Sequence, residues 1–180
     1  MRALIKVILK DGRELLIRRA EEKDAQQLVE YMNLVGGESD FLTYGKNECR
    51  FTVEEERQFL RNQQKNPNNI YLAGFIGDEL ACFANLAAES KKRITHNCEL
   101  GITVRKKYWN LGVASALMKE LIRFARESET LRAIHLDVYA NNQSAIRLYE
   151  KFGFQKVGRM KDYFRVGSQY YDKLMMSLYL

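Results

Sequence analysis

The middle of the chain reads Glu99-Leu100-Gly101-Ile102-Thr103-Val104, then Arg105 to Leu111, then Gly112-Val113-Ala114-Ser115-Ala116-Leu117. Apolar side chains alternate in the first part, which predicts a strand with Leu100, Ile102 and Val104 on one face. The last part carries apolar residues close to a 3.6-residue period, which predicts a helix that begins near Gly112. We therefore expect a strand, a basic turn and a helix.

The start of this helix has the features of an anion site. The first N–H groups of a helix lack partners within it, and the helix dipole attracts anions, most often phosphate, to that end. Gly112 allows a ligand to approach the backbone, and Ala114 and Ser115 leave the approach clear. A basic run at residues 105–107 adds positive charge. From these residues alone, a phosphate site and an ordinary strand-to-helix turn both remain open.

Two motifs in this region resemble those of a known family. Neither a Walker loop nor a G-x-G-x-x-G fingerprint occurs in the chain. Residues 109–114, Trp-Asn-Leu-Gly-Val-Ala, resemble the pyrophosphate loop [RQ]-x-x-G-x-[GA] of the GNAT superfamily of N-acetyltransferases, with Trp109 where Arg or Gln is usual. Residues 142–154 resemble its N-x-x-A-x-x-x-Y-x-x-x-G-F motif. The resemblance is strongest to bacterial members that act on amino acids, other small amines or ribosomal proteins.

Composition is typical of a globular protein. The chain has 180 residues, of which 46% are hydrophobic and 29% charged, so we expect one domain over residues 1–180. The net charge is +6, but basic residues are scattered among 23 acids, which argues against nucleic acid. Three cysteines without C-x-x-C spacing indicate neither a disulfide framework nor a metal site. No run of about 18 apolar residues exists, and we expect a cytoplasmic protein without membrane contact.

Periodicity and turn residues predict strands and helices in the order ββααβββαβαββ, which makes a mixed α/β sheet with helices on its faces. The predicted strands are residues 3–9, 14–18, 70–76, 79–88, 94–104, 134–138, 154–159 and 170–179, and the predicted helices are 21–34, 53–64, 112–127 and 144–151. The resemblance implies a single-domain GNAT-like sheet that splays open to admit coenzyme A.

Acetyl transfer requires a base for the amine, donors for the thioester oxygen and an acid for the leaving thiolate. Tyr149 matches the family position that often protonates the sulfur of coenzyme A, although its spacing with Ala145 and Phe152 also fits a core tyrosine. Glu99 is the candidate base, because that strand often carries one in the family. A solvated glutamate, with water taking the proton, is the alternative for Glu99.

The chain has two histidines, His96 and His135. His96 is the second candidate for the base, because imidazole titrates near neutrality, but a place at a turn or strand end favours a surface role. His135 lies within a short predicted strand and is expected to be structural.

The resemblance also implies residues that hold acetyl-CoA, while no metal is expected. Asn142 matches the position that contacts the pantetheine arm, and as an asparagine it also suits a helix N-cap. Lys106 or Lys107 could reach the 3′-phosphate. The full set of candidate cofactor residues is Ile102, Thr103, Val104, Asn110, Leu111, Gly112, Val113, Ala114, Ser115, Asn142 and Tyr149.

The acceptor site is expected between the first two helices and the late strands, as in the family. Glu38, Asp40 and Asp162 could bind a cationic amine, with Phe41 and Tyr163 as apolar walls; a solvated acidic loop is the alternative.

Three functions stay open at this point. The leading one is acetyl-CoA-dependent transfer to a primary amine of a small molecule, such as an amino acid or polyamine, by direct attack in a ternary complex. The second is acetylation of a protein N-terminus, for example of a ribosomal protein. The third is a coenzyme A-binding regulator without catalysis, against which Tyr149 argues. The apolar strand from Leu174 to Tyr179 is either core or the contact of a homodimer.

Overall fold

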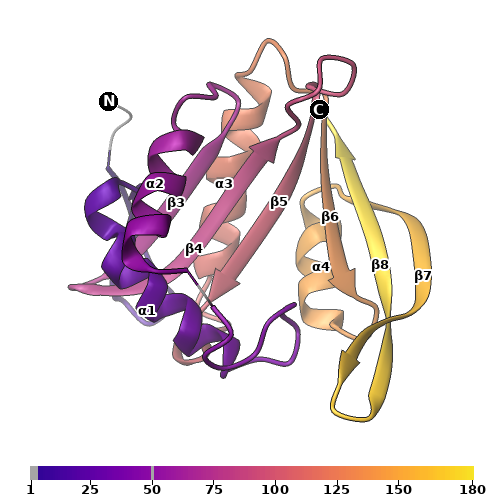
Figure 1. Cartoon of the computed structure of the whole chain (residues 1–180), viewed down its shortest axis with the longest axis horizontal. Coiled ribbons are helices and arrows are strands. Elements are labelled where there is room, and N and C mark those ends of the chain that lie inside the picture. Colours follow the sequence, from indigo (N-terminus) through magenta and orange to yellow (C-terminus); the bar gives the residue numbers. More distant parts are fainter. Residues whose placement is uncertain (1–3, 50) are drawn as a thin grey trace.

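The computed structural model describes residues 4–49 and 51–180, and its elements follow the predicted order (Figure 1). The first predicted strand begins at Ala3, which lies outside the described residues. The strands are β1 (Ile5–Ile8), β2 (Glu14–Arg19), β3 (Ile70–Ile76), β4 (Glu79–Ala88), β5 (Asn97–Val104), β6 (Ala133–Tyr139), β7 (Gln155–Val166) and β8 (Gln169–Tyr179). The helices are α1 (Ala25–Gly36), α2 (Val53–Gln63), α3 (Val113–Arg126) and α4 (Gln143–Lys151).

Predicted boundaries were wrong by three residues or more at two strands and at the first helix, which begins at Ala25 rather than Glu21 because a 3-10 turn at Glu22–Asp24 precedes it. β5 begins at Asn97 rather than Ile94, because Ile94 N–H bonds to the carbonyl of Lys91 at 2.9 Å and so prolongs the turn. β7 runs to Val166 rather than Arg159. Two register shifts, at residues 156–158 and 160–164, interrupt its alternation, so no period-2 pattern marks the second half.

The eight strands form one mixed sheet in the order β1-β2-β3-β4-β5-β6-β8-β7, which confirms the predicted fold class. Helices α1 and α2 cover one face of the sheet, and α3 and α4 lie on the other (Figure 1). Each face has its own apolar core: Leu28 and Leu60 pack on the α1–α2 side, and Leu117, Leu121 and Ile146 pack on the α3–α4 side.

The strands β5 and β6 diverge within the sheet. They are parallel, and their pairing covers only Asn97–Glu99 of β5 against Ala133–His135 of β6. On its other side β5 stays paired with β4 as far as Val104. The β6-facing backbone edge of β5 is therefore unpaired beyond Glu99, and Figure 1 shows the two strands separating toward their carboxyl ends.

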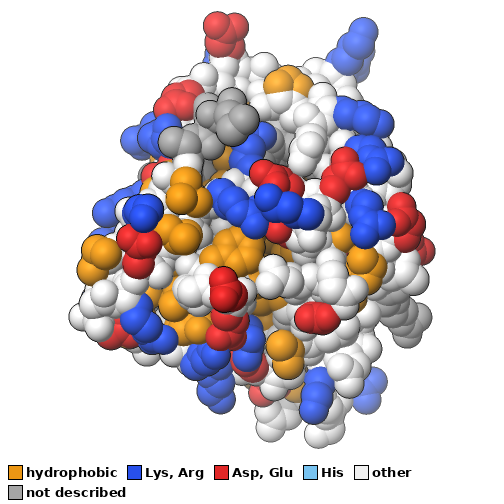
Figure 2. Space-filling model, turned by 90° about the vertical axis from the view of Figure 1, so that its left-hand side faces the viewer, with side chains coloured by type: hydrophobic (Ala, Val, Ile, Leu, Met, Phe, Trp, Pro, Cys, Tyr) orange, Lys and Arg blue, Asp and Glu red, His pale blue; other side chains and the backbone are white. Residues whose placement is uncertain are grey.

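Strand β8 lies inside the sheet, between β6 and β7. Leu174, Met176 and Leu178 are buried there, so this apolar strand is core and not an edge that pairs with a second copy. No helix within the described ranges is long and apolar enough to cross a membrane. On the face drawn in Figure 2, basic and acidic side chains are interspersed and form no basic stripe.

Candidate active site

The N-terminus of α3 is open to a ligand. Gly112 caps the helix in the left-handed conformation, with φ 96°, and no atom lies within 4 Å of where its side chain would begin. The first intrahelical bond runs from Ala116 N–H to the carbonyl of Gly112 at 3.0 Å, which leaves the preceding N–H groups without a helical partner. Asn110 is also left-handed, with φ 63°, and it turns the chain into the helix. Unpartnered N–H groups at a helix N-terminus are the arrangement that favours anions.

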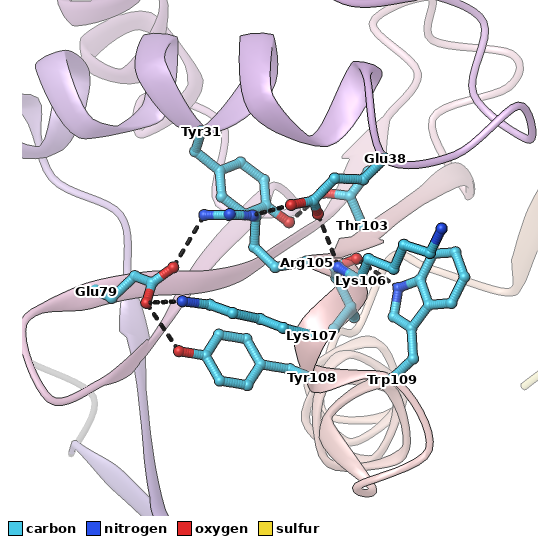
Figure 3. Close-up of polar contacts among 10 residues, drawn as sticks. Tyr31, Glu38, Glu79, Thr103, Arg105, Lys106, Lys107, Tyr108 and Trp109 are labelled. Atoms are coloured by element: carbon cyan, nitrogen blue, oxygen red, sulfur yellow. Dashed lines mark hydrogen bonds and ion pairs between the residues drawn. The ribbon is translucent and has the colours of Figure 1, made fainter.

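Two of the three cations in the basic turn before α3 are paired with Glu79 of β4. Arg105 Nη1 lies 2.9 Å and Lys107 Nζ 2.5 Å from the carboxylate, and Tyr108 donates its hydroxyl to it at 2.9 Å (Figure 3). Although burial acts to raise it, hydrogen bonds from Lys107 and Tyr108 hold the pKa of Glu79 below its ordinary value. Within the described ranges the ammonium of Lys106 has no ion-pair partner, so Lys106 is the cation of this turn that is free to meet a phosphate.

Trp109 holds the turn against β5. Its indole Nε1 donates to the carbonyl of Val104 at 2.7 Å, while the ring stays 40% exposed (Figure 3). The motif position where the family usually has Arg or Gln is thus occupied by a residue that contacts the protein's own backbone. Further along the turn, Leu111 accepts a hydrogen bond from Lys10 N–H at 3.2 Å.

Glu99 lies on the sheet face that α1 covers, opposite Leu100. Thr103, four residues along the same strand, faces α1 and accepts a hydrogen bond from Tyr31 at 2.9 Å, and residues four apart in a strand share a face. Glu99 is exposed and lines a pocket of about 240 Å³ at the point where β5 and β6 diverge. The lining residues are Glu89, Asn97, Cys98, Glu99, His135, Leu136 and Asp137. The sequence pointed to Glu99 alone; its acidic neighbours in the pocket are Glu89, which follows the end of β4, and Asp137 of β6.

His135, in the lining of this pocket, bonds to the strands on both sides of β6. One ring nitrogen lies 2.9 Å from Asn97 Oδ1 on β5 and the other 2.8 Å from Ser177 Oγ on β8. Both nitrogens are engaged with neighbouring strands, in keeping with the structural role expected for this residue. His96 is exposed in the turn before β5 and does not line the pocket.

Tyr149 lies on α4 in the core of the α3–α4 side, where it is 7% exposed and its ring packs 5.9 Å from that of Phe154. Burial raises the pKa of Tyr149 to about 12, so the hydroxyl keeps its proton at neutral pH. Asn142 caps the same helix by accepting a hydrogen bond from Ala145 N–H at 3.1 Å. Tyr149 and Glu99 thus lie on opposite faces of the sheet.

Aromatic rings connect the two segments that were predicted to bind the acceptor. Phe41 meets the ring of Tyr139 edge-on at 5.6 Å, Tyr139 stacks on Phe164 at 3.8 Å, and Phe164 contacts Tyr163 at 5.0 Å. Tyr139 was not among the predicted site residues, although it follows His135 and Asp137 in the period-2 pattern of β6.

The three predicted acidic residues lie in different environments. Asp40 is exposed beside Phe41. Asp162 has φ 52° in the β7 bulge, where its N–H donates to Asp172 at 2.9 Å. Glu38 does not point into the space expected for the acceptor, because it binds the turn before α3. It accepts hydrogen bonds from Arg105 Nε at 2.8 Å and from Lys106 N–H at 2.7 Å (Figure 3).

Comparisons with known proteins agree with this geometry. The family model "Acetyltransferase (GNAT) family" matches residues 38–154. A crystal structure of a GNAT-family acetyltransferase from Streptococcus pneumoniae is 36% identical, with a TM-score of 0.89 over 92% of this chain and 99% of that one. The acetyltransferase yncA from Salmonella typhimurium, solved with its cofactor acetyl-CoA, has a TM-score of 0.80 at 17% identity, over 92% and 93%. The L-amino acid N-acetyltransferase AaaT of Escherichia coli is 26% identical over 164 residues, 91% of this chain and 97% of that protein.

A splayed mixed sheet, an open helix N-terminus beside the gap and a family match over residues 38–154 define an acyltransferase. The chain belongs to the GNAT family of acetyltransferases, whose members use acetyl-CoA.

Proposed function

We propose that this protein moves the acetyl group of acetyl-CoA to the primary amine of a small molecule, such as an amino acid or polyamine, by direct attack in a ternary complex. The observation that carries the proposal is the divergence of β5 and β6 beyond Glu99. The gap has the free N-terminus of α3 on one face and a carboxylate-lined pocket on the other. AaaT, by its name, acts on L-amino acids, which supports a small acceptor.

The residues around α3 fit coenzyme A. The open space before Gly112 and the free N–H groups of Val113, Ala114 and Ser115 suit a pyrophosphate, with Asn110 and Leu111 shaping the approach. The unpaired edge of β5 can bond the amides of the pantetheine arm through backbone groups of Ile102 and Val104, as an added strand would, whereas those of Thr103 point toward β4. Bound there, acetyl-CoA supplies an acetyl group activated as a thioester. A β5 N–H group would donate to the thioester oxygen.

Glu99 and Tyr149 would carry the two proton transfers. Glu99, exposed in the pocket, would take the proton of the acceptor ammonium directly or through water. Tyr149, protonated because its burial raises the pKa to about 12, would give its proton to the thiolate sulfur of coenzyme A. Asn142 would contact the pantetheine arm with the part of its amide that does not cap α4.

The acceptor would enter on the α1–α2 side. There the exposed rings of Phe41 and Tyr163 would pack against its apolar part, and the carboxylates of Asp40 and Asp162 would attract a cationic group. Glu38 enters this proposal through the turn it holds, because both its oxygens are engaged.

The test is release of free coenzyme A thiol from acetyl-CoA with amino acids, polyamines, aminoglycosides and short N-terminal peptides as acceptors. We expect turnover with one small-amine class, and a fall in kcat of roughly 10²-fold or more in Tyr149→Phe, in the range of a lost general acid. The matched control is Tyr170→Phe, which changes an exposed tyrosine of β8 outside the proposed site.

The outcomes separate the alternatives. Turnover with N-terminal peptides alone would assign the activity to protein N-termini. Unchanged turnover in Tyr149→Phe would keep the enzyme and remove the acid. Coenzyme A binding without turnover on any amine would favour a regulator, and absence of binding would overturn the cofactor site.

A further inference from the structure

The chain segment that follows α1 crosses from the end of β5 to the end of β6; residues 38–42 are called the strap below. At its first residue, both carboxylate oxygens of Glu38 are engaged beyond the end of β5, with Arg105 Nε at 2.8 Å and Lys106 N–H at 2.7 Å (Figure 3). The side chains of Glu38 and Arg105 are 22% and 15% exposed. A two-oxygen contact of this kind fixes direction as well as distance.

The other end of the strap is held by β6. The hydroxyl of Tyr139, the last residue of that strand, donates to the carbonyl of Leu42 at 3.2 Å. The ring of Phe41 meets the ring of Tyr139 edge-on at 5.6 Å. Three residues, 39–41, therefore separate the contact with β5 from the contact with β6.

The base of the strap is packed closely. At Gly36, where α1 ends, a Cβ atom would lie 2.4 Å from the carbonyl oxygen of Gly45, so the chain returns against the helix end. One turn earlier in α1, Tyr31 donates its hydroxyl to Thr103 of β5 at 2.9 Å. The strap therefore leaves a helix that is itself bonded to β5.

These contacts place the strap across the carboxyl ends of two parallel strands that have separated. Its Glu38 end touches the turn that leads to the α3 phosphate site, and its Phe41 end belongs to the aromatic group of the acceptor side. We propose that Glu38 is a positioning residue that couples the cofactor site and the acceptor site. When coenzyme A orders the turn before α3, the bonds of Glu38 to Arg105 and Lys106 order the strap as well. The strap then fixes the position of the aromatic acceptor side relative to the thioester. This inference rests on the proposed function.

The charge arrangement supports a coupling role over simple stability. Arg105 is shared between Glu38 and Glu79, so the turn stays anchored to β4 when Glu38 is changed. The loss of Glu38 would then release the strap from the turn while the turn keeps its place. Because Glu79 still pairs with Arg105 in the variant, the guanidinium keeps a carboxylate partner and folding should survive.

The experiment is hydrogen–deuterium exchange of the full chain with and without coenzyme A, in wild type, Glu38→Ala and Glu38→Gln. In wild type we expect coenzyme A to slow exchange by about threefold or more both at residues 113–116 and at residues 39–44. In Glu38→Ala the slowing at 113–116 should remain and that at 39–44 should be lost. Glu38→Gln keeps one carbonyl oxygen, so its slowing at 39–44 should lie between that of wild type and that of Glu38→Ala. It replaces the alanine variant in the test if that variant does not fold.

Glu22→Ala is the control, because it also removes the carboxylate of an arginine ion pair, here a more exposed one with Arg61 at 2.6 Å between other elements. It should keep the wild-type response at both segments. A wild-type protein that shows no slowing at 113–116 would overturn the proposed function. Slowing at 113–116 without slowing at 39–44 in wild type, or strap slowing that persists in Glu38→Ala, would overturn the coupling alone.

Discussion

Trp109 and Val104 are joined by a 2.7 Å hydrogen bond from the indole Nε1 to the backbone carbonyl. The bond closes the turn between β5 and α3, at the end of the strand edge that is proposed to bond the pantetheine arm. Trp109 is the one tryptophan of the chain, so its fluorescence reports on this junction directly.

Replacing Trp109 with Phe keeps an aromatic ring and removes the N–H donor. A hydrogen bond contributes about 0.5–1.5 kcal/mol, so we expect the KM for acetyl-CoA to rise about three- to ten-fold. Because the proposed acid and base are untouched, kcat should stay within about twofold. Steady-state thiol release at saturating acceptor measures both constants. A wild-type KM in this variant would show that the bond does not shape the cofactor site.

Gly112→Ala tests the proposed phosphate site, and Gly12→Ala is its control. Gly112 and Gly12 both have positive φ, 96° and 86°, and both have open space where a Cβ would lie. Each alanine substitution should lower the free energy of unfolding by about 1–2 kcal/mol, because a Cβ disfavours this conformation. Only Gly112→Ala should weaken coenzyme A binding, by about tenfold or more, because its methyl group enters the path of the pyrophosphate.

Urea denaturation and a coenzyme A titration followed by Trp109 fluorescence give the two quantities. Equal binding by both alanine variants would argue that the pyrophosphate does not approach Gly112.

Lys106 and Lys107 are adjacent lysines with different surroundings. Lys107 is paired with Glu79 at 2.5 Å, while Lys106 has no such partner within the described ranges. We expect Lys106→Ala to weaken coenzyme A binding about three- to ten-fold at low salt and less at high salt, because the interaction is exposed and screened. Titrations at two salt concentrations measure this. A larger effect of Lys107→Ala would reverse the assignment.

The pKa of Tyr149 predicts a loss of stability at alkaline pH. An unfolded tyrosine ionises near pH 10, whereas burial holds the proton of folded Tyr149 to about pH 12. Above pH 10 the unfolded chain releases this proton first, so the free energy of unfolding falls as the pH rises toward 12. Tyr149→Phe should lose less stability than wild type between pH 9 and about pH 11. Urea midpoints at the two pH values measure it, and equal losses would contradict a buried neutral hydroxyl.

The sequence was sufficient where local rules decide the structure. The alternation from Leu100 to Val104 and the small residues after Gly112 identify β5, the turn and α3, because strand period and helix start depend on neighbouring residues. The spacing of Thr52 and Glu55 likewise indicates a capping box before α2, and Thr52 accepts from Glu55 N–H at 3.2 Å.

The sequence was insufficient where distant segments meet. Glu38 looked like an acceptor ligand because its partner Arg105 lies 67 positions away, and no periodicity connects them. Tyr139 was missed because its importance comes from rings of other segments, Phe41 and Phe164. The second half of β7 was missed because register shifts hide its alternation.

The position of β8 between β6 and β7 has a consequence for biosynthesis. The ribosome makes β6 and β7 before β8. Until β8 emerges, β7 has no partner in the sheet and β6 has only its short pairing with β5. During this interval one edge of β6 and the whole of β7 are unpaired, and such exposed strands can form intermolecular β-pairing with other nascent chains. The acceptor wall, where Tyr171 of β8 packs 6.0 Å from Tyr139, is completed last. Acceptor recognition would therefore mature after the cofactor half of the molecule has already folded.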